Sequence, residues 1–210
     1  MTHKKNSPLA LLAVLAVSLF IAPTSLRADD AGSWISLQLN KGWQSSYAFL
    51  RLEHRSNQKF GSTEATFLAT GAGYKFCPWL KTDLSYEYWN VNPEITMHKA
   101  VLTTTGTLQR DGLAVSVREK LEYAINPATS AKSYTLRSRL RAQYSIPETN
   151  VTPYAMAEVF NWKAWVRSLY YAGAEFKFGD HSVVDLFYLY HLPNGNEPVN
   201  VLGLGYYFNF

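Results

Sequence analysis

The sequence predicts an all-β fold: a transmembrane, antiparallel, up-and-down β-barrel of ten to twelve strands, preceded by a signal peptide. Three observations lead to this prediction. Apolar and polar residues alternate with a period of two through almost the whole chain from Ser33 onward, which is typical of strands with two different faces. Charged side chains gather on one of these faces. Aromatic side chains on the other face gather near the strand ends, as in barrels that cross a membrane.

Residues 1–28 have the pattern of a secretory signal peptide. Lys4 and Lys5 precede an apolar run from residue 9 to residue 22, and the small residue Ala28 follows. This run is shorter than the roughly 20 residues that a transmembrane helix needs. We therefore expect 1–28 to be removed on export, leaving 29–210 as one barrel domain. Cys77 is the only cysteine, so no internal disulfide is expected.

The leader also accounts for most of the positive charge. The full chain has 20 Lys and Arg against 16 Asp and Glu, and three of the cations, Lys4, Lys5 and Arg27, lie in the leader. Residues 29–210 therefore hold 17 cationic and 16 anionic side chains, a net charge near +1. A nearly neutral chain gives no reason to expect a nucleic-acid partner.

Eleven segments have strand character, beginning near residues 33, 46, 65, 79, 98, 113, 133, 152, 167, 181 and 198. In the first, SWISLQLN, the apolar residues Ile35, Leu37 and Leu39 alternate with polar ones, while Trp34 is an exception in the polar phase. Bacterial single-chain barrels have an even number of strands. Trp34 therefore favours ten strands, with the first segment outside the wall. Twelve strands would require one more in a loop.

The later segments repeat the alternation in chain order. Clear cases are YAFLRLEHR, WLKTDLSYEYW, AVSVREKLEY, YTLRSRLRAQY, RSLYYAGAEFKF, VVDLFYLYH and VLGLGYYFNF. Short turns alternate with longer loops between the strands, which is typical of outer-membrane barrels with tight periplasmic turns. The short turns are Cys77-Pro78, Asp111-Gly112, SIPETN and Gly179-Asp180, and the longer loops are SNQKFGST, NVNPEITM, INPATSAK, NWKAWV and PNGNEP.

The polar face carries twelve cations and seven anions, and we expect these side chains to line the lumen. The cations are Arg51, Arg55, Lys75, Lys81, Lys99, Arg118, Lys120, Arg137, Arg139, Arg141, Arg167 and Lys177; the anions are Glu53, Asp83, Glu87, Glu122, Glu158, Glu175 and Asp185. On the apolar face the mid-strand charge is Glu119, which a β-bulge would explain.

A secreted lipocalin-like binding barrel would show the same alternation with its polar face outward. Charge segregation favours the membrane, because lipid penalises Arg or Lys at the bilayer centre by about 2–4 kcal/mol. The apolar-face aromatics also favour it, since they form two belts around an aliphatic band. One belt holds Tyr74, Phe76, Tyr144, Phe176, Phe178 and Phe208, and the other holds Tyr86, Tyr88, Tyr123, Tyr134, Tyr188 and Tyr190.

The final segment, GLGYYFNF, places Tyr206, Phe208 and Phe210 on one face. This arrangement resembles the C-terminal signal by which the outer-membrane assembly machinery recognises its substrates. We therefore expect the chain in the bacterial outer membrane, with the assembly machinery as a partner during insertion and with membrane lipids and lipopolysaccharide as neighbours.

Five stretches follow one another in a recognisable order: SWISLQL, LRLEHR, LRSRLRAQ, AEVF and VLGLGYYFNF. In this order the chain resembles an uncharacterised family of predicted bacterial outer-membrane β-barrels, known as a domain of unknown function. The resemblance spans most of residues 29–210 and implies the barrel fold. It implies little about function, because that family has no established activity.

The lumen is expected to be basic, since its twelve cations and seven anions sum to about +5. Two interpretations remain open. Each carboxylate could pair with a cation and close the interior, because a barrel of about ten strands has little bore once long side chains meet. Alternatively the arginines could form a narrow pore for small anionic solutes, since guanidinium binds carboxylate and phosphate at two points.

An enzymatic alternative rests on the stretch EHRSNQ. His54 and Ser56 lie two residues apart, and a hairpin could bring Glu64 alongside, which would give an outer-leaflet acyl-ester hydrolase acting on lipid A or phospholipid. The stretch is similar to the His-x-Ser-Asn motif of outer-membrane phospholipase A and lipid A deacylase. It departs from that motif at Gln58, where Gly or Ala is usual. We expect no metal or cofactor, because the histidines lack metal-ligand spacing and the sequence has no phosphate-binding glycine loop. We also expect no enzyme activity, because His and Ser in a polar loop shoulder are more often without a catalytic role.

Overall fold

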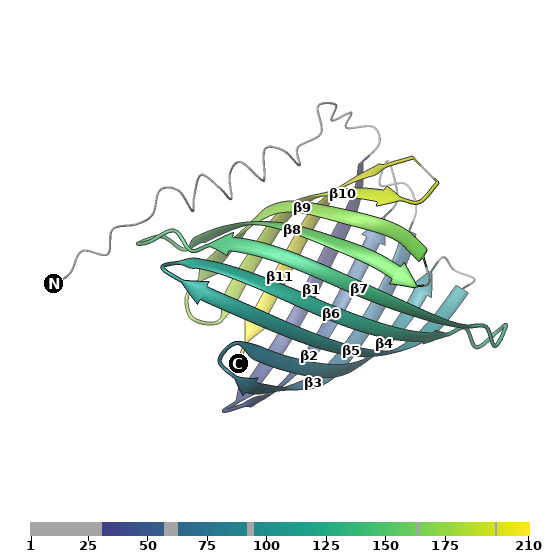
Figure 1. Cartoon of the computed structure of the whole chain (residues 1–210), viewed down its shortest axis with the longest axis horizontal. Coiled ribbons are helices and arrows are strands. Elements are labelled where there is room, and N and C mark those ends of the chain that lie inside the picture. Colours follow the sequence, from purple (N-terminus) through teal and green to yellow (C-terminus); the bar gives the residue numbers. More distant parts are fainter. Residues whose placement is uncertain (1–30, 57–62, 92–94, 163, 196) are drawn as a thin grey trace.

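The computed structural model describes residues 31–56, 63–91, 95–162, 164–195 and 197–210. These residues form eleven strands and no helix, and the strands close into one barrel (Figure 1). No helix within the described ranges is long and apolar enough to span a membrane. The strands are β1 (Ala31–Trp43), β2 (Ser46–Ser56), β3 (Thr63–Cys77), β4 (Leu80–Val91), β5 (Ile95–Arg110), β6 (Leu113–Ile125), β7 (Lys132–Tyr144), β8 (Val151–Trp162), β9 (Ala164–Phe178), β10 (Ser182–Pro193) and β11 (Val199–Asn209). The predicted signal peptide, 1–28, lies outside the described residues.

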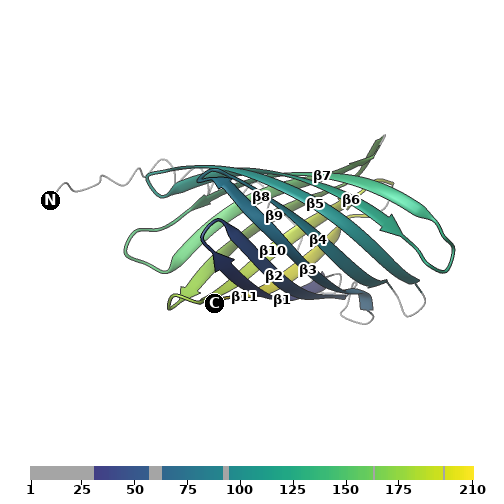
Figure 2. The same ribbon diagram turned by 90° about the horizontal axis from the view of Figure 1, so that it is seen from below.

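Each strand pairs in antiparallel fashion with its chain neighbours, and the barrel closes where β1 pairs in parallel with β11 (Figure 2). The parallel pair follows from the odd strand number, because the first and last strands of an up-and-down series of eleven run in the same direction. The prediction of ten or twelve strands is therefore wrong. The eleven predicted segments are confirmed, since every strand begins within three residues of its expected start.

Trp34 occupies a polar-face position of the first strand for a structural reason. It lies on β1, a full wall strand, and its side chain is buried in the interior, where the Arg55 guanidinium lies 3.8 Å from the Trp34 ring centroid. The tryptophan belongs to the inward phase because it covers a cation, a contact that is favourable when both groups are withdrawn from water. Its place in the polar phase was therefore no sign that the first segment lies outside the wall.

The two faces of the wall differ sharply in polarity. Leu84 is 62% exposed and Leu140 55% exposed on the outer face, whereas Glu87 and Glu158 on the inner face are 1% and 0% exposed. A water-soluble barrel buries its apolar side chains and exposes its charges. This barrel has the opposite arrangement.

Glu119 lies on the outer face, as its position in the alternation indicates. The pairing of β6 is continuous with both β5 and β7, so the proposed bulge at Glu119 is wrong. Its carboxylate instead accepts a hydrogen bond of 2.7 Å from the Ser138 hydroxyl on β7. The register shifts that the structure contains lie at Arg55/Ser56, Lys75/Cys77 and Phe160/Asn161.

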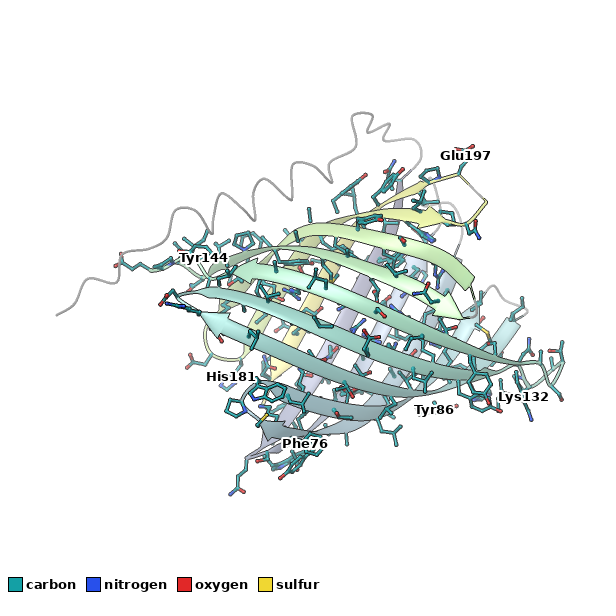
Figure 3. The ribbon with its side chains drawn as sticks, in the orientation of Figure 1. Phe76, Tyr86, Lys132, Tyr144, His181 and Glu197 are labelled. Carbon is teal, nitrogen blue, oxygen red and sulfur yellow. The ribbon has the colours of Figure 1, made fainter. Side chains whose placement is uncertain are left out.

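The two ends of the barrel carry different connections. One end, the short-turn end, holds the β1–β2, β3–β4, β5–β6, β7–β8 and β9–β10 turns and the C-terminus, and the other, which we call the loop end, holds the β6–β7 connection and the opposite ends of the strands (Figure 1). Phe76, Tyr144 and His181 lie at the short-turn end, and Tyr86 and Lys132 at the loop end (Figure 3). Tyr134 is exposed on the outer face, but Tyr144 is buried, so the expected belt of exposed aromatics does not include it.

A close approach between β10 and β11 requires glycine at position 203. Gly203 pairs with Phe187, and a Cβ atom at this position would overlap the Phe187 ring. Phe187 packs against the buried cluster inside the barrel, so its ring has little freedom to move away.

We therefore expect Gly203→Ala to lower the free energy of unfolding by about 1–3 kcal/mol, as overpacking in a filled interior does. The measurement is a urea titration of the barrel refolded in detergent micelles. Gly42→Ala is the matched control, because a Cβ there meets no atom within 4 Å. Equal loss in both variants would contradict the close approach.

Candidate functional site

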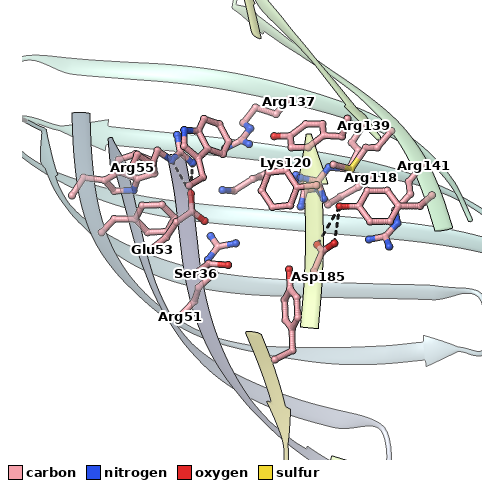
Figure 4. Close-up of a pocket in the computed structure, with 18 residues that line it drawn as sticks. Ser36, Arg51, Glu53, Arg55, Arg118, Lys120, Arg137, Arg139, Arg141 and Asp185 are labelled. Carbon is pink, nitrogen blue, oxygen red and sulfur yellow. Dashed lines mark hydrogen bonds and ion pairs between the residues drawn. The ribbon is translucent and has the colours of Figure 1, made fainter. Parts of the chain in front are cut away.

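Among the described residues, the interior of the barrel includes polar cavities of about 120, 180 and 370 Å³. Arg51 on β2 and Arg118 on β6 line all three, so the cavities meet at these two side chains. Figure 4 shows the first cavity, with arginines converging on it from β2, β6 and β7. The interior is therefore one charged space divided by long side chains.

Glu158 on β8 organises the densest group of charges. It is fully buried, and its two carboxylate oxygens contact three arginines: Arg118 at 2.7 Å, Arg137 at 3.1 Å and Arg139 at 3.2 Å. The strand register explains this convergence, because Arg118 pairs with Arg139 across β6–β7 and Arg139 pairs with Glu158 across β7–β8. Two like charges directly opposite one another are destabilising. The Glu158 carboxylate offsets that repulsion.

Glu122 on β6 offsets a second pair of like charges in the neighbouring row. Lys120 and Arg137 also pair across β6–β7, and the same Glu122 oxygen lies 3.1 Å from the Lys120 ammonium and 2.7 Å from the Arg137 guanidinium. The other oxygen lies 3.3 Å from the Lys99 ammonium on β5. Arg137 therefore joins Glu122 to Glu158.

Glu87 on β4 extends the group across the lumen. Its carboxylate lies 3.0 Å from the Lys120 ammonium and 3.5 Å from the Arg51 guanidinium on β2. It also accepts a 2.7 Å hydrogen bond from the Trp89 indole. We call this connected set the central ion network: Arg51, Lys99, Arg118, Lys120, Arg137 and Arg139 with Glu87, Glu122 and Glu158. Six cations share three carboxylates, so the network carries three excess positive charges.

Aromatic rings cover several of the same cations. Arg137 and Arg167 lie on the Phe160 ring, at 4.2 and 4.1 Å from its centroid, and Lys99 lies 3.9 Å from the Trp89 ring. A cation over an aromatic face gains about 0.5–2 kcal/mol, more when both are withdrawn from water. These contacts stabilise cations for which the lumen has too few carboxylates.

The two halves of the lumen have different linings. Two apolar clusters lie inside the barrel, and most of their residues lie nearer the loop end. One is formed by Trp34, Tyr154, Met156, Phe160, Leu169, Tyr171, Leu189 and Val201, of which Tyr154 lies near the short-turn end of β8, and the other by Ala65, Phe67, Ala69 and Trp89. The half nearer the short-turn end contains the 370 Å³ cavity, which Gln38, Asn40, Arg141 and Asn209 help to line. The central ion network borders both, since Arg51, Arg118 and Arg139 line the cavity while Lys99 and Arg137 lie against Trp89 and Phe160.

The remaining charged side chains predicted for the lumen have simpler surroundings. Glu53 pairs with Arg55 at 2.7 Å, and Glu175 pairs with Arg141 at 2.6 Å. Asp83 accepts a hydrogen bond from Tyr47, and Asp185 accepts one from Tyr154. Lys177 is exposed on β9 near the short-turn end.

The apolar lining of the loop-end half of the lumen was not predicted from the sequence. Alternation assigned the polar phase to the interior, but Phe67, Trp89, Leu169 and Leu189 also point there. The sequence pattern that could have predicted this lining is the one seen at Trp34: bulky apolar residues occupy positions of the polar face near one end of their strands. Their clustering at one end predicts an apolar layer inside the barrel.

His54 and Ser56 of the hydrolase hypothesis bond to different residues and not to each other. The His54 ring bonds to the Thr66 hydroxyl at 2.8 Å, and the Ser56 hydroxyl bonds to the Ser33 hydroxyl at 2.8 Å. Ser56 is buried, and the register shift beside it leaves Glu64 between the partners of Arg55 and Ser56. This geometry does not support an assembled Ser–His–acid triad.

The fold and its interior define the class of this protein: a closed, all-β barrel with a charged and ion-paired lumen. The chain belongs to the family described as "Protein of unknown function (DUF2490)", whose match covers residues 31–201. The resemblance to an uncharacterised family is therefore confirmed. The search of curated proteins found no match.

Glu158→Gln tests the importance of the central ion network. The variant keeps the size of the side chain but leaves Arg118 and Arg139 without their carboxylate. Because breaking a buried ion pair leaves charge uncompensated, we expect the free energy of unfolding to fall by about 3–5 kcal/mol. Urea titration in detergent micelles measures it.

Glu119→Gln is the matched control, with the same substitution on the neighbouring outer face. Its carboxylate is exposed and bonds to the Ser138 hydroxyl. We expect a change of about 0.5 kcal/mol or less, as for most surface substitutions. A comparable loss in the two variants would show that the network does not stabilise the barrel.

Proposed function

We propose that this protein is an integral barrel of the bacterial outer membrane, with a lumen closed by ion pairs rather than open as a pore. One observation carries the proposal: the barrel exposes many leucines and aromatic residues on its outer face while burying the carboxylates of Glu87, Glu122, Glu158 and Asp185 inside. Leu108 on the outer face is 74% exposed. In water so much exposed apolar surface would promote aggregation, whereas in lipid it is the favourable arrangement.

The C-terminal strand supports the same location. Tyr206 and Phe210 are exposed, and the Phe210 amide donates a hydrogen bond of 2.9 Å to the Asn40 carbonyl of β1. Before β1 pairs with β11 and closes the barrel, these aromatic side chains at the C-terminal end would be available to the outer-membrane assembly machinery. By analogy with other outer-membrane barrels, the short-turn end faces the periplasm.

The central ion network favours a closed lumen over a narrow anion pore. Its ion pairs connect β2 on one side of the barrel with β8 on the other, through Glu87, Glu122 and Glu158. Apolar side chains of the two clusters lie nearer the loop end, where Trp89 and Phe160 stand two residues beyond Glu87 and Glu158 on their strands. An ion crossing the lumen would have to separate buried pairs, which is costly.

The other functional hypotheses have weaker support. A lipocalin-like barrel binds its ligand in an apolar interior cavity, but the interior cavities here are lined by arginines. The hydrolase hypothesis lacks an assembled triad. We propose that the protein is not an enzyme and has lipids and lipopolysaccharide as its membrane neighbours.

Planar-bilayer recording of the refolded protein tests the closed lumen. We expect no steady single-channel conductance, because the central ion network and the apolar layer occupy the path between the two ends. The mobility of the unboiled protein on a denaturing gel serves as the control for folding. A steady conductance with anion preference would replace the closed lumen with the pore hypothesis.

Cell fractionation tests the membrane location separately. The mature chain should sediment with outer membranes and resist extraction by alkaline carbonate, because its apolar outer face is embedded in lipid. Recovery of folded protein in a detergent-free soluble fraction would contradict the location.

A further inference from the structure

The 370 Å³ cavity at the short-turn end has features that neither the closed lumen nor the membrane position requires. Four arginines line it, namely Arg51, Arg118, Arg139 and Arg141, with Glu175 as the one carboxylate among its lining residues. Its volume lies within the range of small-molecule binding pockets, about 300–1,000 Å³. The cavity is therefore large enough for a small organic anion.

The carboxylates of the lumen leave these arginines with spare hydrogen-bond donors. Each guanidinium contacts one carboxylate: Arg118 and Arg139 contact Glu158, Arg141 contacts Glu175, and Arg51 contacts Glu87. Each of these contacts uses the Nη2 group of its arginine. The Nε atoms have almost no accessible surface and no hydrogen-bond partner among the described residues. The donors that an anion in the cavity would meet are therefore the terminal N–H groups of the guanidiniums, which make charge-assisted hydrogen bonds to oxyanions.

Packing holds the guanidiniums in place before any ligand arrives. Arg141 lies between Glu175, at 2.6 Å, and the Tyr154 ring, at 4.0 Å from the centroid. The Tyr154 hydroxyl donates to the Asp185 carboxylate at 3.0 Å, which fixes the ring in turn. Arg139 lies two residues from Arg141 on the same face of β7. Groups ordered in advance lose less entropy on binding.

Neutral hydrogen-bonding groups form the other side of the cavity. The Gln38 amide donates to Asn40 at 2.8 Å, and the Asn40 amide donates to Asn209 at 3.1 Å. Tyr207 completes this side. Amide and phenol groups suit hydroxyl groups of a ligand, whereas the arginines suit an oxyanion.

The geometry points to a binding site for a phosphorylated sugar at the short-turn end of the lumen. Phosphate provides three acceptor oxygens and up to two negative charges, which matches several guanidiniums better than a single carboxylate does. The sugar hydroxyls would lie against Gln38, Asn40 and Asn209. The site depends on the barrel interior alone, so it can be tested in detergent whether or not the chain resides in the outer membrane.

Isothermal titration calorimetry of the refolded chain in an uncharged detergent tests the site, with glucose 6-phosphate, inorganic phosphate and glucose as probes. We expect glucose 6-phosphate to bind more tightly than phosphate, and glucose to give no measurable binding. Arg139→Gln and Arg141→Gln should each weaken glucose 6-phosphate binding by about tenfold or more, because each loses a charge-assisted contact. Lys132→Gln, the same charge change at the far end of β7, should leave binding unchanged.

Two further variants separate recognition of the sugar from folding. Gln38→Ala and Asn40→Ala keep every charge of the lumen and should weaken binding of glucose 6-phosphate but not of phosphate. Circular dichroism and gel mobility establish that each variant is folded. Absence of glucose 6-phosphate binding to the folded wild-type chain would overturn the proposal. Equal affinity for phosphate and glucose 6-phosphate, or equal weakening by Lys132→Gln, would overturn it as well.

Discussion

A buried charge must have a partner, and this constraint shapes the inside of the barrel. Arginine and lysine side chains stand opposite one another on β6 and β7, in the pairs Arg118–Arg139 and Lys120–Arg137. Such rows would repel if they were left alone. Glu122 and Glu158 lie among them and hold each pair together. Three carboxylates are shared by six cations. This sharing draws the arginines together, divides the lumen and leaves a surplus of positive charge.

The apolar layer and the ion network have complementary roles. Phe160 covers Arg137 and Arg167, and Trp89 both covers Lys99 and donates to Glu87. The rings exclude water from the ion pairs, and exclusion of water strengthens each pair. Toward the short-turn end the apolar lining gives way to amides and partly exposed arginines. A lumen that is packed at one end and hollow at the other suits binding from one side better than passage through the barrel.

Much of the wall could be predicted from the sequence, because a period of two fixes both the strands and the face that each side chain occupies. Arg137, Arg139 and Arg141 were assigned inward on this basis. Their partners could not be predicted, since contacts across a barrel depend on strand number and register, and the even-number rule led to the wrong closure. Trp34 illustrates this difficulty. The sequence shows that it occupies a polar-face position, but its contact with the Arg55 guanidinium on the next strand appears only in the structure.

We propose that the barrel is apolar outside and charged inside because lipid surrounds it. Spin labels placed one at a time at Leu136, Ser138, Leu140 and Ala142, in a Cys77→Ser background, test this proposal while leaving the arginines of β7 intact. In lipid vesicles, we expect all four labels to collide more often with dissolved oxygen than with a water-soluble nickel reagent. More frequent collisions with the nickel reagent at positions 136 and 140 would contradict the proposal, because those side chains would then face water.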